Sequence, residues 1–167
     1  MSDPGQDIGN SLSNAVDKVD HTTIALGLEL TVAAGSVFLM VVIHSVGLIG
    51  ISHLLRLNDE RLKRHEMNFR AIVLMAQLGL TIFVLHLIEI GIFAAFYLWV
   101  GGIDTLEEAI HYSASTYATL GAPAGYLPRE WRLIGSIEAL IGFVLIGWST
   151  AFMVSTMRKL SESAPKR

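Results

Sequence analysis

The chain has 167 residues, of which 52% are hydrophobic and only 16% are charged, and its formal net charge is −3. This composition is far from that of a soluble domain of the same length, and it gives no indication of nucleic-acid binding. The absence of cysteine excludes disulfides, thiolate metal ligands and cysteine catalysis.

The first segment, residues 1–23, is polar and carries four aspartates among glycine, serine and asparagine. It lacks the basic start and apolar centre of a cleavable signal peptide. We expect a mobile or lightly structured tail.

Three long apolar runs follow, and each exceeds the roughly 20 residues that a helix needs to cross a bilayer. They are residues 24–55, 71–100 and 132–158. Their titratable side chains away from the ends are Glu29, His44, His53, His86, Glu89 and Glu138. The sequence therefore predicts an all-α integral membrane protein with three transmembrane helices.

The connecting segments predict the orientation of these helices. Residues 56–70 and the tail 159–167 are both rich in lysine and arginine. Basic segments next to membrane helices usually stay in the cytoplasm. We therefore expect a multi-pass protein of the plasma (inner) membrane, with its N-terminus outside and its C-terminus in the cytoplasm. Four aromatic residues then fall near the outer interface, namely Tyr97, Trp99, Tyr126 and Trp131.

The outer connection predicts a short helix over residues 105–118. Thr105 and Glu108 have the spacing of a capping box, with Asp104 as the alternative N-cap. Glutamates in the first turn also interact favourably with the helix dipole. The helix must end at the following glycines and proline, in residues 119–125. No catalytic triad, phosphate loop or paired catalytic carboxylates occur outside the apolar runs, so we do not expect an enzyme.

This order of long helix, short helix, Thr-x-Gly segment and long helix resembles the pore of tetrameric potassium-type cation channels, particularly small bacterial members. Thr119-Leu120-Gly121-Ala122-Pro123-Ala124 stands where those channels have Thr-Val-Gly-Tyr-Gly-Asp. The other similar segments are residues 111–118, residues 130–133, residues 135–139, Gly142 and Gly147. The similarity covers about residues 83–158.

The resemblance implies a pore domain over residues 71–158, preceded by one extra transmembrane helix. Its parts would be the outer helix 71–100, the pore helix 105–118, the filter loop 119–125 and the inner helix 132–158. It implies a homotetramer in the lipid bilayer that conducts monovalent cations passively, with bound K⁺ or Na⁺ and no other cofactor. The ion pathway would be formed by Thr119, Leu120, Gly121, Ala122 and Pro123.

The outer half of the filter departs from the pattern of that family. Pro123 has φ fixed near −65° and no backbone donor, and Ala122 lacks the ring that braces such a filter. We therefore expect weak selectivity for potassium over sodium. The alternative hypothesis is a non-conducting or regulatory membrane protein that keeps the channel scaffold and has lost the filter.

Further roles are predicted around this pore. An intramembrane carboxylate is normally paired, so Glu138 is expected to support the filter by bracing the pore helix. The alternatives are a site that tunes cation occupancy and a partly solvated glutamate near the outer interface. Its expected partners on the pore helix are Tyr112, Ser113 and Thr116. If Gly142 is a hinge of the inner helix, the residues facing the inner pore and gate are Phe143, Ile146, Thr150 and Val154.

Two histidines and a glutamate form the remaining polar group. His86 and Glu89 share one face of their helix, and His44 can reach it. The favoured hypothesis is a hydrogen-bonded group that docks the first helix on the second, without a metal. A metal site is the alternative, since imidazole and carboxylate are both usable ligands. Glu29 is expected to reach solvent.

Overall fold

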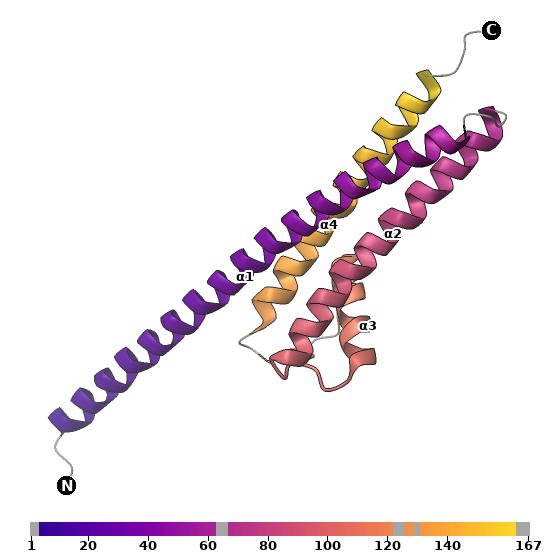
Figure 1. Cartoon of the computed structure of the whole chain (residues 1–167). Helices are drawn as coiled ribbons and strands as arrows, with labels where there is room; N and C mark the ends of the chain where they lie inside the picture. The colour runs from indigo at the N-terminus through magenta and orange to yellow at the C-terminus, as the bar shows by residue number, and fades with distance from the viewer. Residues whose placement is uncertain (1–3, 63–66, 122–125, 129–130, 163–167) are drawn as a thin grey trace.

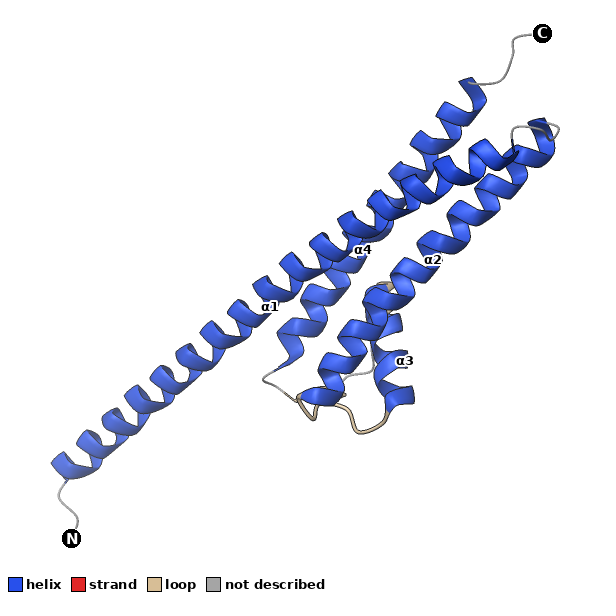
Figure 2. Ribbon diagram, viewed as in Figure 1, coloured by secondary structure: helices blue, strands red, loops and turns tan. Residues whose placement is uncertain are grey.

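The structure is a computed structural model of the chain, and it describes residues 4–62, 67–121, 126–128 and 131–162. Within these ranges it contains four α-helices and no strand, as Figure 1 and Figure 2 show. The helices are α1 (Pro4–Leu62), α2 (Met67–Trp99), α3 (Leu106–Tyr117) and α4 (Arg132–Glu162). The prediction of an all-α chain is confirmed.

The three long helices lie side by side (Figure 1). α2 runs antiparallel to α1, and α4 returns in the direction of α1, so the two termini lie at opposite ends of the molecule. The short helix α3 packs against α2 and α4. It begins beside the end of α2 and extends back along it (Figure 1).

Each long helix contains a segment that is long and apolar enough to cross a membrane. These segments are Leu26–Arg56, Ala71–Trp99 and Arg132–Lys159, with 31, 29 and 28 residues. At a rise of 1.5 Å per residue, each exceeds the roughly 30 Å thickness of the hydrocarbon layer. The length and composition of three helices are therefore those of a membrane protein.

The distribution of side chains is the reverse of that in a water-soluble protein. Large apolar side chains point outward, for example Phe38, Leu80 and Phe143, with 73%, 67% and 67% of their surface exposed. Polar side chains lie inside, where they can find partners that lipid does not offer. Those with no exposed surface are His44, Glu89, Ser113 and Glu138.

The helices extend further than the apolar runs predict. α1 begins at Pro4, so the expectation of a lightly structured tail over residues 1–23 is wrong from residue 4 onward. Proline is tolerated in a first helical turn, and no other proline occurs before Pro123. Helix also occupies much of residues 56–70, and α4 continues to Glu162. Hydropathy indicates the residue at which a helix leaves the apolar layer of the membrane. The helix itself can continue beyond that residue.

The interior has two distinct halves. In the first, which we call the apolar half, leucine and isoleucine side chains of α1 and α2 pack together: Leu48, Ile51, Leu55, Leu74, Leu78, Ile82 and Leu85. In the second, which we call the polar half, α3 lies against α2 and α4 and the buried polar side chains are gathered: His44, Glu89, Ser113, Glu138 and Ser149.

Candidate functional site

The helix α3 is capped at both ends. Thr105 is its N-cap, with an extended backbone (φ −119°, ψ 148°) and an Oγ1 atom that accepts the N–H of Glu108 at 3.3 Å. The predicted capping threonine is thus confirmed. Glu107 and Glu108 lie in the first turn, where their negative charge interacts favourably with the positive end of the helix dipole.

The C-terminal end of α3 closes with two backbone hydrogen bonds. The N–H of Leu120 donates to Ser115 O and the N–H of Thr119 donates to Thr116 O, both at 2.9 Å. This pair of bonds is a Schellman motif. Thr119 occupies its left-handed position at φ 60°, which is unusual for a β-branched residue, and Gly121 follows at φ 82°.

This end of α3 lies deep between two of the candidate membrane spans. Tyr117 donates from its hydroxyl to Glu89 Oε2 at 2.5 Å, and its backbone lies beside Gly142. Glu89 is ten residues before Trp99, and Gly142 is ten residues after Arg132. At 1.5 Å per residue, α3 therefore ends about 15 Å inside the ends of both helices.

Gly142 permits this approach because it has no side chain. A Cβ atom there would lie 2.4 Å from the carbonyl oxygen of Tyr117 and 3.0 Å from its Cα. Gly147, by contrast, has open space around its Cα. The two glycines that resemble hinge positions therefore differ, since only Gly142 faces α3.

Glu138 of α4 is paired inside the polar half. It accepts hydrogen bonds from the hydroxyl of Tyr97 on α2 and from Ser113 Oγ on α3, the latter at 2.5 Å. Ser113 Oγ is also 2.9 Å from the carbonyl oxygen of Ile90. One carboxylate thus joins three helices. Among its expected partners, Ser113 makes the contact.

The two other residues expected to partner Glu138 make no hydrogen bond to it in the described part of the chain. The Tyr112 hydroxyl lies beside Gly135, and a Cβ atom added at Gly135 would be 2.6 Å from it. Thr116 is buried, and its Oγ1 has no hydrogen-bond partner among the described residues. Tyr97, predicted at the outer interface, is completely buried, and its hydroxyl faces inward to Glu138.

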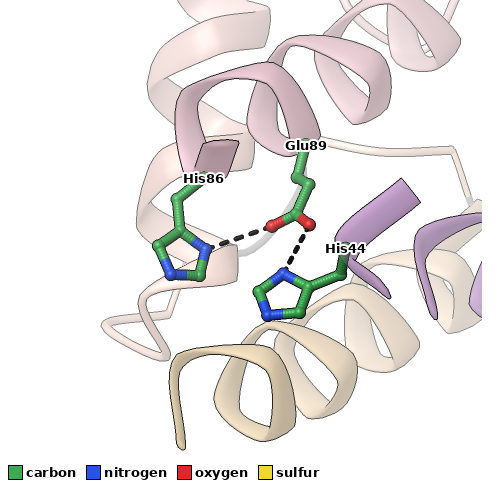
Figure 3. Close-up of side chains that lie close together, drawn as sticks. All are labelled: His44, His86 and Glu89. Atoms are coloured by element: carbon green, nitrogen blue, oxygen red, sulfur yellow. Dashed lines mark hydrogen bonds and ion pairs between the residues drawn. The ribbon is translucent and has the colours of Figure 1, made fainter. Parts of the chain in front are cut away.

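The predicted polar group of His44, His86 and Glu89 comes together as one cluster (Figure 3). His44 Nδ1 is 2.8 Å from Glu89 Oε1, and His86 Nδ1 is 3.1 Å from Glu89 Oε2. The carboxylate of Glu89 lies between the two rings, which come from α1 and α2 (Figure 3). His44 and Glu89 have no exposed surface, and His86 is 15% exposed.

Sequence reasoning missed two members of this cluster. Tyr117 Oη is 2.9 Å from His86 Nδ1 as well as bonded to Glu89, and Ser149 Oγ of α4 is 3.3 Å from His44 Nε2. The cluster therefore joins all four helices. No sequence signal identifies these partners, because the choice depends on how α3 and α4 are rotated.

Glu29 also has a different role from the one expected. Its Oε1 accepts the N–H of Leu133 at 3.0 Å, so α1 satisfies a free donor in the first turn of α4. The side chain does not simply reach solvent. Its acceptor role could not be predicted, because the two residues are more than a hundred positions apart.

The residues predicted to face the ion path are exposed on the single chain where the structure describes them. Thr119 and Gly121 are exposed, Leu120 is 81% exposed, and Ala122 and Pro123 lie outside the described residues. The predicted inner-pore side chains on α4 are exposed as well: Phe143, Ile146, Thr150 and Val154. The described residues among these are available to other molecules or chains.

No protein-family profile matches the chain, and neither a curated protein nor a solved structure matches it.

Proposed function

We propose that the chain is one subunit of a homotetrameric channel for monovalent cations in the cell membrane, with Thr119–Gly121 beside the ion path. The observation that carries this proposal is the depth of α3. The helix ends about 15 Å inside α2 and α4, and α4 then begins near the end of α2 where α3 started (Figure 1). A backbone that turns at this depth is tolerated when it is buried or lines a water-filled path.

The chemistry at this turn suits a cation. The C-terminus of a helix carries partial negative charge, and carbonyl oxygens that replace water select ions in known channels. Thr119 is held at φ 60°, a conformation that is costly for a threonine. Strain of this kind persists where the surrounding structure fixes it, and functional sites are where it gathers.

The proposed tetramer is supported by the presence of one such turn in each chain. A single chain supplies one turn and cannot surround an ion, so closed rotational symmetry must supply the others. Leu120 and Phe143 are exposed on the single chain, which suits residues that a tetramer would turn toward its central ion path. The basic residues at the far ends of α1 and α4 support an orientation with those ends in the cytoplasm and the N-terminus outside.

One observation favours a second function. Pro123 follows two residues after Gly121, and it restricts the backbone that a complete filter would need. The second candidate is therefore a non-conducting or regulatory membrane protein with the same scaffold. If the chain conducts, the same residue predicts little discrimination between K⁺ and Na⁺.

Ion flux into liposomes that contain the purified chain distinguishes the two candidates. We expect cation flux from a species with the native mass of a tetramer, with a reversal potential near zero under opposed K⁺ and Na⁺ gradients. Gly121→Val should abolish the flux, because valine resists φ 82°.

Gly101→Val is the matched control for this variant. Gly101 also has positive φ (65°), is exposed and has open space, but it lies in the connection after α2. The control should conduct normally. A tetramer without flux would favour the second candidate, and normal flux through Gly121→Val would overturn the assignment of the ion path.

A further inference from the structure

We propose that His44, His86 and Glu89, with Tyr117 as a fourth ligand, form a buried site for a divalent transition-metal ion of the zinc type. The site lies in the polar half, at the junction of α1, α2 and α3 (Figure 3). It is independent of whether the chain conducts ions.

The first argument is the set of ligand atoms and their convergence. One nitrogen from each imidazole and one oxygen from the carboxylate all lie within 4.8 Å of one another. Zinc is bound by histidine nitrogen and carboxylate oxygen at about 2.0–2.2 Å, so ligand atoms of a tetrahedral shell lie about 3.3 Å apart. His44 Nδ1 lies 2.8 Å from Glu89 Oε1 and His86 Nδ1 lies 3.1 Å from Glu89 Oε2, so both rings direct a nitrogen at the same carboxylate.

The second argument is the fourth ligand. Tyr117 Oη lies 2.9 Å from His86 Nδ1 and 2.5 Å from Glu89 Oε2. The hydroxyl oxygen of Tyr117 therefore lies next to two of the other ligand groups, the His86 imidazole and the Glu89 carboxylate. The sequence pattern offers three ligands, and the structure adds a fourth oxygen, which matches the coordination number of four that zinc adopts.

The third argument is the outer shell around His44. A histidine that binds a metal through one ring nitrogen normally donates the other N–H to an oxygen, which fixes the ring and its tautomer. His44 directs Nδ1 at Glu89 and places Nε2 3.3 Å from Ser149 Oγ. Ser149 is itself buried, so this oxygen is held in position by the fold.

The fourth argument is charge. Among the residues that the structure describes, the ion-pair partners of Glu89 are the two imidazoles, and no lysine or arginine pairs with it. A completely buried carboxylate in a membrane span is costly and is normally paired. The hydroxyls of Tyr97 and Ser113 pair with Glu138, whereas Glu89 faces two imidazole nitrogens, which are metal-ligand atoms. A divalent ion would offset the negative charge of Glu89 and use the Nδ1 atoms of both rings as ligands.

Cobalt binding tests the site, because Co²⁺ adopts zinc-like geometry and its visible absorption reports the ligands. We expect the metal-stripped full chain, purified without a polyhistidine tag, to bind one Co²⁺ per chain, and Zn²⁺ to bleach the absorption. Glu89→Gln and His86→Ala should each abolish the band. His53→Ala and His111→Ala are matched controls at exposed histidines, and they should keep it.

Two further readouts separate a metal site from a purely structural cluster. Ser149→Ala should keep the stoichiometry and weaken Co²⁺ affinity about 10- to 100-fold, as loss of an outer-shell partner does. Zn²⁺ should raise the unfolding temperature of the wild type and leave that of Glu89→Gln unchanged. If His86→Ala fails to fold, Glu89→Gln, which keeps the shape of the side chain, still decides the question.

Two results would overturn this inference. One is the absence of a Co²⁺ band in the wild type together with an unfolding temperature that Zn²⁺ does not change, which would leave a proton-sharing cluster. The other is an equal band in Glu89→Gln, which would place the bound ion elsewhere. Since neither measurement uses ion flux, a chain that binds Co²⁺ without conducting would retain this site and lose the proposed channel.

Discussion

The apolar half and the polar half of this protein both contain a buried apolar cluster, and the polar half adds buried, hydrogen-bonded polar side chains to it. In the apolar half, the buried side chains of α1 and α2 are leucine and isoleucine, and Met75, Phe152 and Met153 pack against them. In the polar half, Glu138 accepts hydrogen bonds from side chains of α2 and α3, and Glu89 bonds to side chains of α1 and α3. Lipid is as apolar as leucine, so contacts of the first kind gain only from close packing, whereas polar groups find few substitutes in lipid.

This difference indicates which half fixes the arrangement of the helices and which half tolerates substitutions. Hydrogen-bonded carboxylates fix the rotation of a helix and its depth, because a small movement breaks several bonds at once. Apolar side chains can change rotamer and repack. We therefore expect substitutions in the polar half to cost more free energy of unfolding than matched substitutions in the apolar half.

The largest effect is expected for Glu138→Ala. The change removes the acceptor of Tyr97 and Ser113 and leaves both hydroxyls buried, so we expect a loss of about 2–4 kcal/mol. Denaturation by sodium dodecyl sulfate of the detergent-solubilised protein measures this quantity. Glu138→Gln is the control, because its amide keeps the shape and an acceptor, and it should cost less than half as much.

A loss below about 1 kcal/mol for Glu138→Ala would break the contrast between the two halves. It would mean that α3 remains in place without its bonds to α4. Apolar packing around Tyr97 and Tyr112, whose rings meet edge to face at 5.1 Å, would then be the main support of α3.

The second effect is expected for Gly142→Ala, which tests close backbone packing in the polar half. The new Cβ meets the Tyr117 carbonyl oxygen at 2.4 Å, and backbone atoms cannot move aside as a flexible side chain does. We expect a cost of about 2 kcal/mol. Gly147→Ala is the matched control on the same helix, because it has open space and gains about 0.5 kcal/mol in helix propensity. Equal stability of the two variants would show that the end of α3 is free to shift.

How far these two halves could be predicted from the sequence differs as well. The apolar half follows directly from hydropathy, because long apolar runs with few charges predict membrane helices. In the polar half, the pairing of Glu138 with Ser113 and the meeting of His44, His86 and Glu89 also follow, since a buried charge in a span needs a partner and few candidates exist.

The remaining partners in the polar half could not be predicted, and the reason is geometric. Tyr97 lies near the end of a span, where the preference of aromatic rings for the interface predicts exposure, yet the rotation of α2 turns it inward. Ser149 and Tyr117 join the cluster only because α3 and α4 have a particular depth and rotation. Hydropathy gives no information on the depth or the rotation of a helix. It also predicts a first helix that starts near residue 24, whereas α1 begins at Pro4.

A third and smaller effect is expected in the apolar half for Leu78→Ala. Leu78 is completely buried against α1, and in a water-soluble core this change costs about 2–5 kcal/mol. In lipid the term for transfer from water is absent, and only the loss of packing remains, so we expect about 1–2 kcal/mol. The same denaturation measurement tests it. A cost at or above that of Glu138→Ala would reverse the order of the two halves.

The smallest effect is expected for Gly47→Ala, which completes the contrast with Gly142→Ala. A Cβ on Gly47 would lie 2.5 Å from Leu85 Cδ1 and 2.7 Å from Leu85 Cδ2, distances as short as those at Gly142. The obstacle here is the end of a flexible side chain, which can adopt another rotamer at a cost of about 0.5–1.5 kcal/mol. Alanine also favours a helix over glycine by about 0.5–1 kcal/mol, so the two terms nearly cancel. We expect a net change below about 1 kcal/mol, with Gly50→Ala, which meets nothing within 4 Å, as the control on α1. If Gly47→Ala destabilises the protein as much as Gly142→Ala does, Leu85 is held as rigidly as the backbone of α3, and the tolerance attributed to the apolar half is wrong.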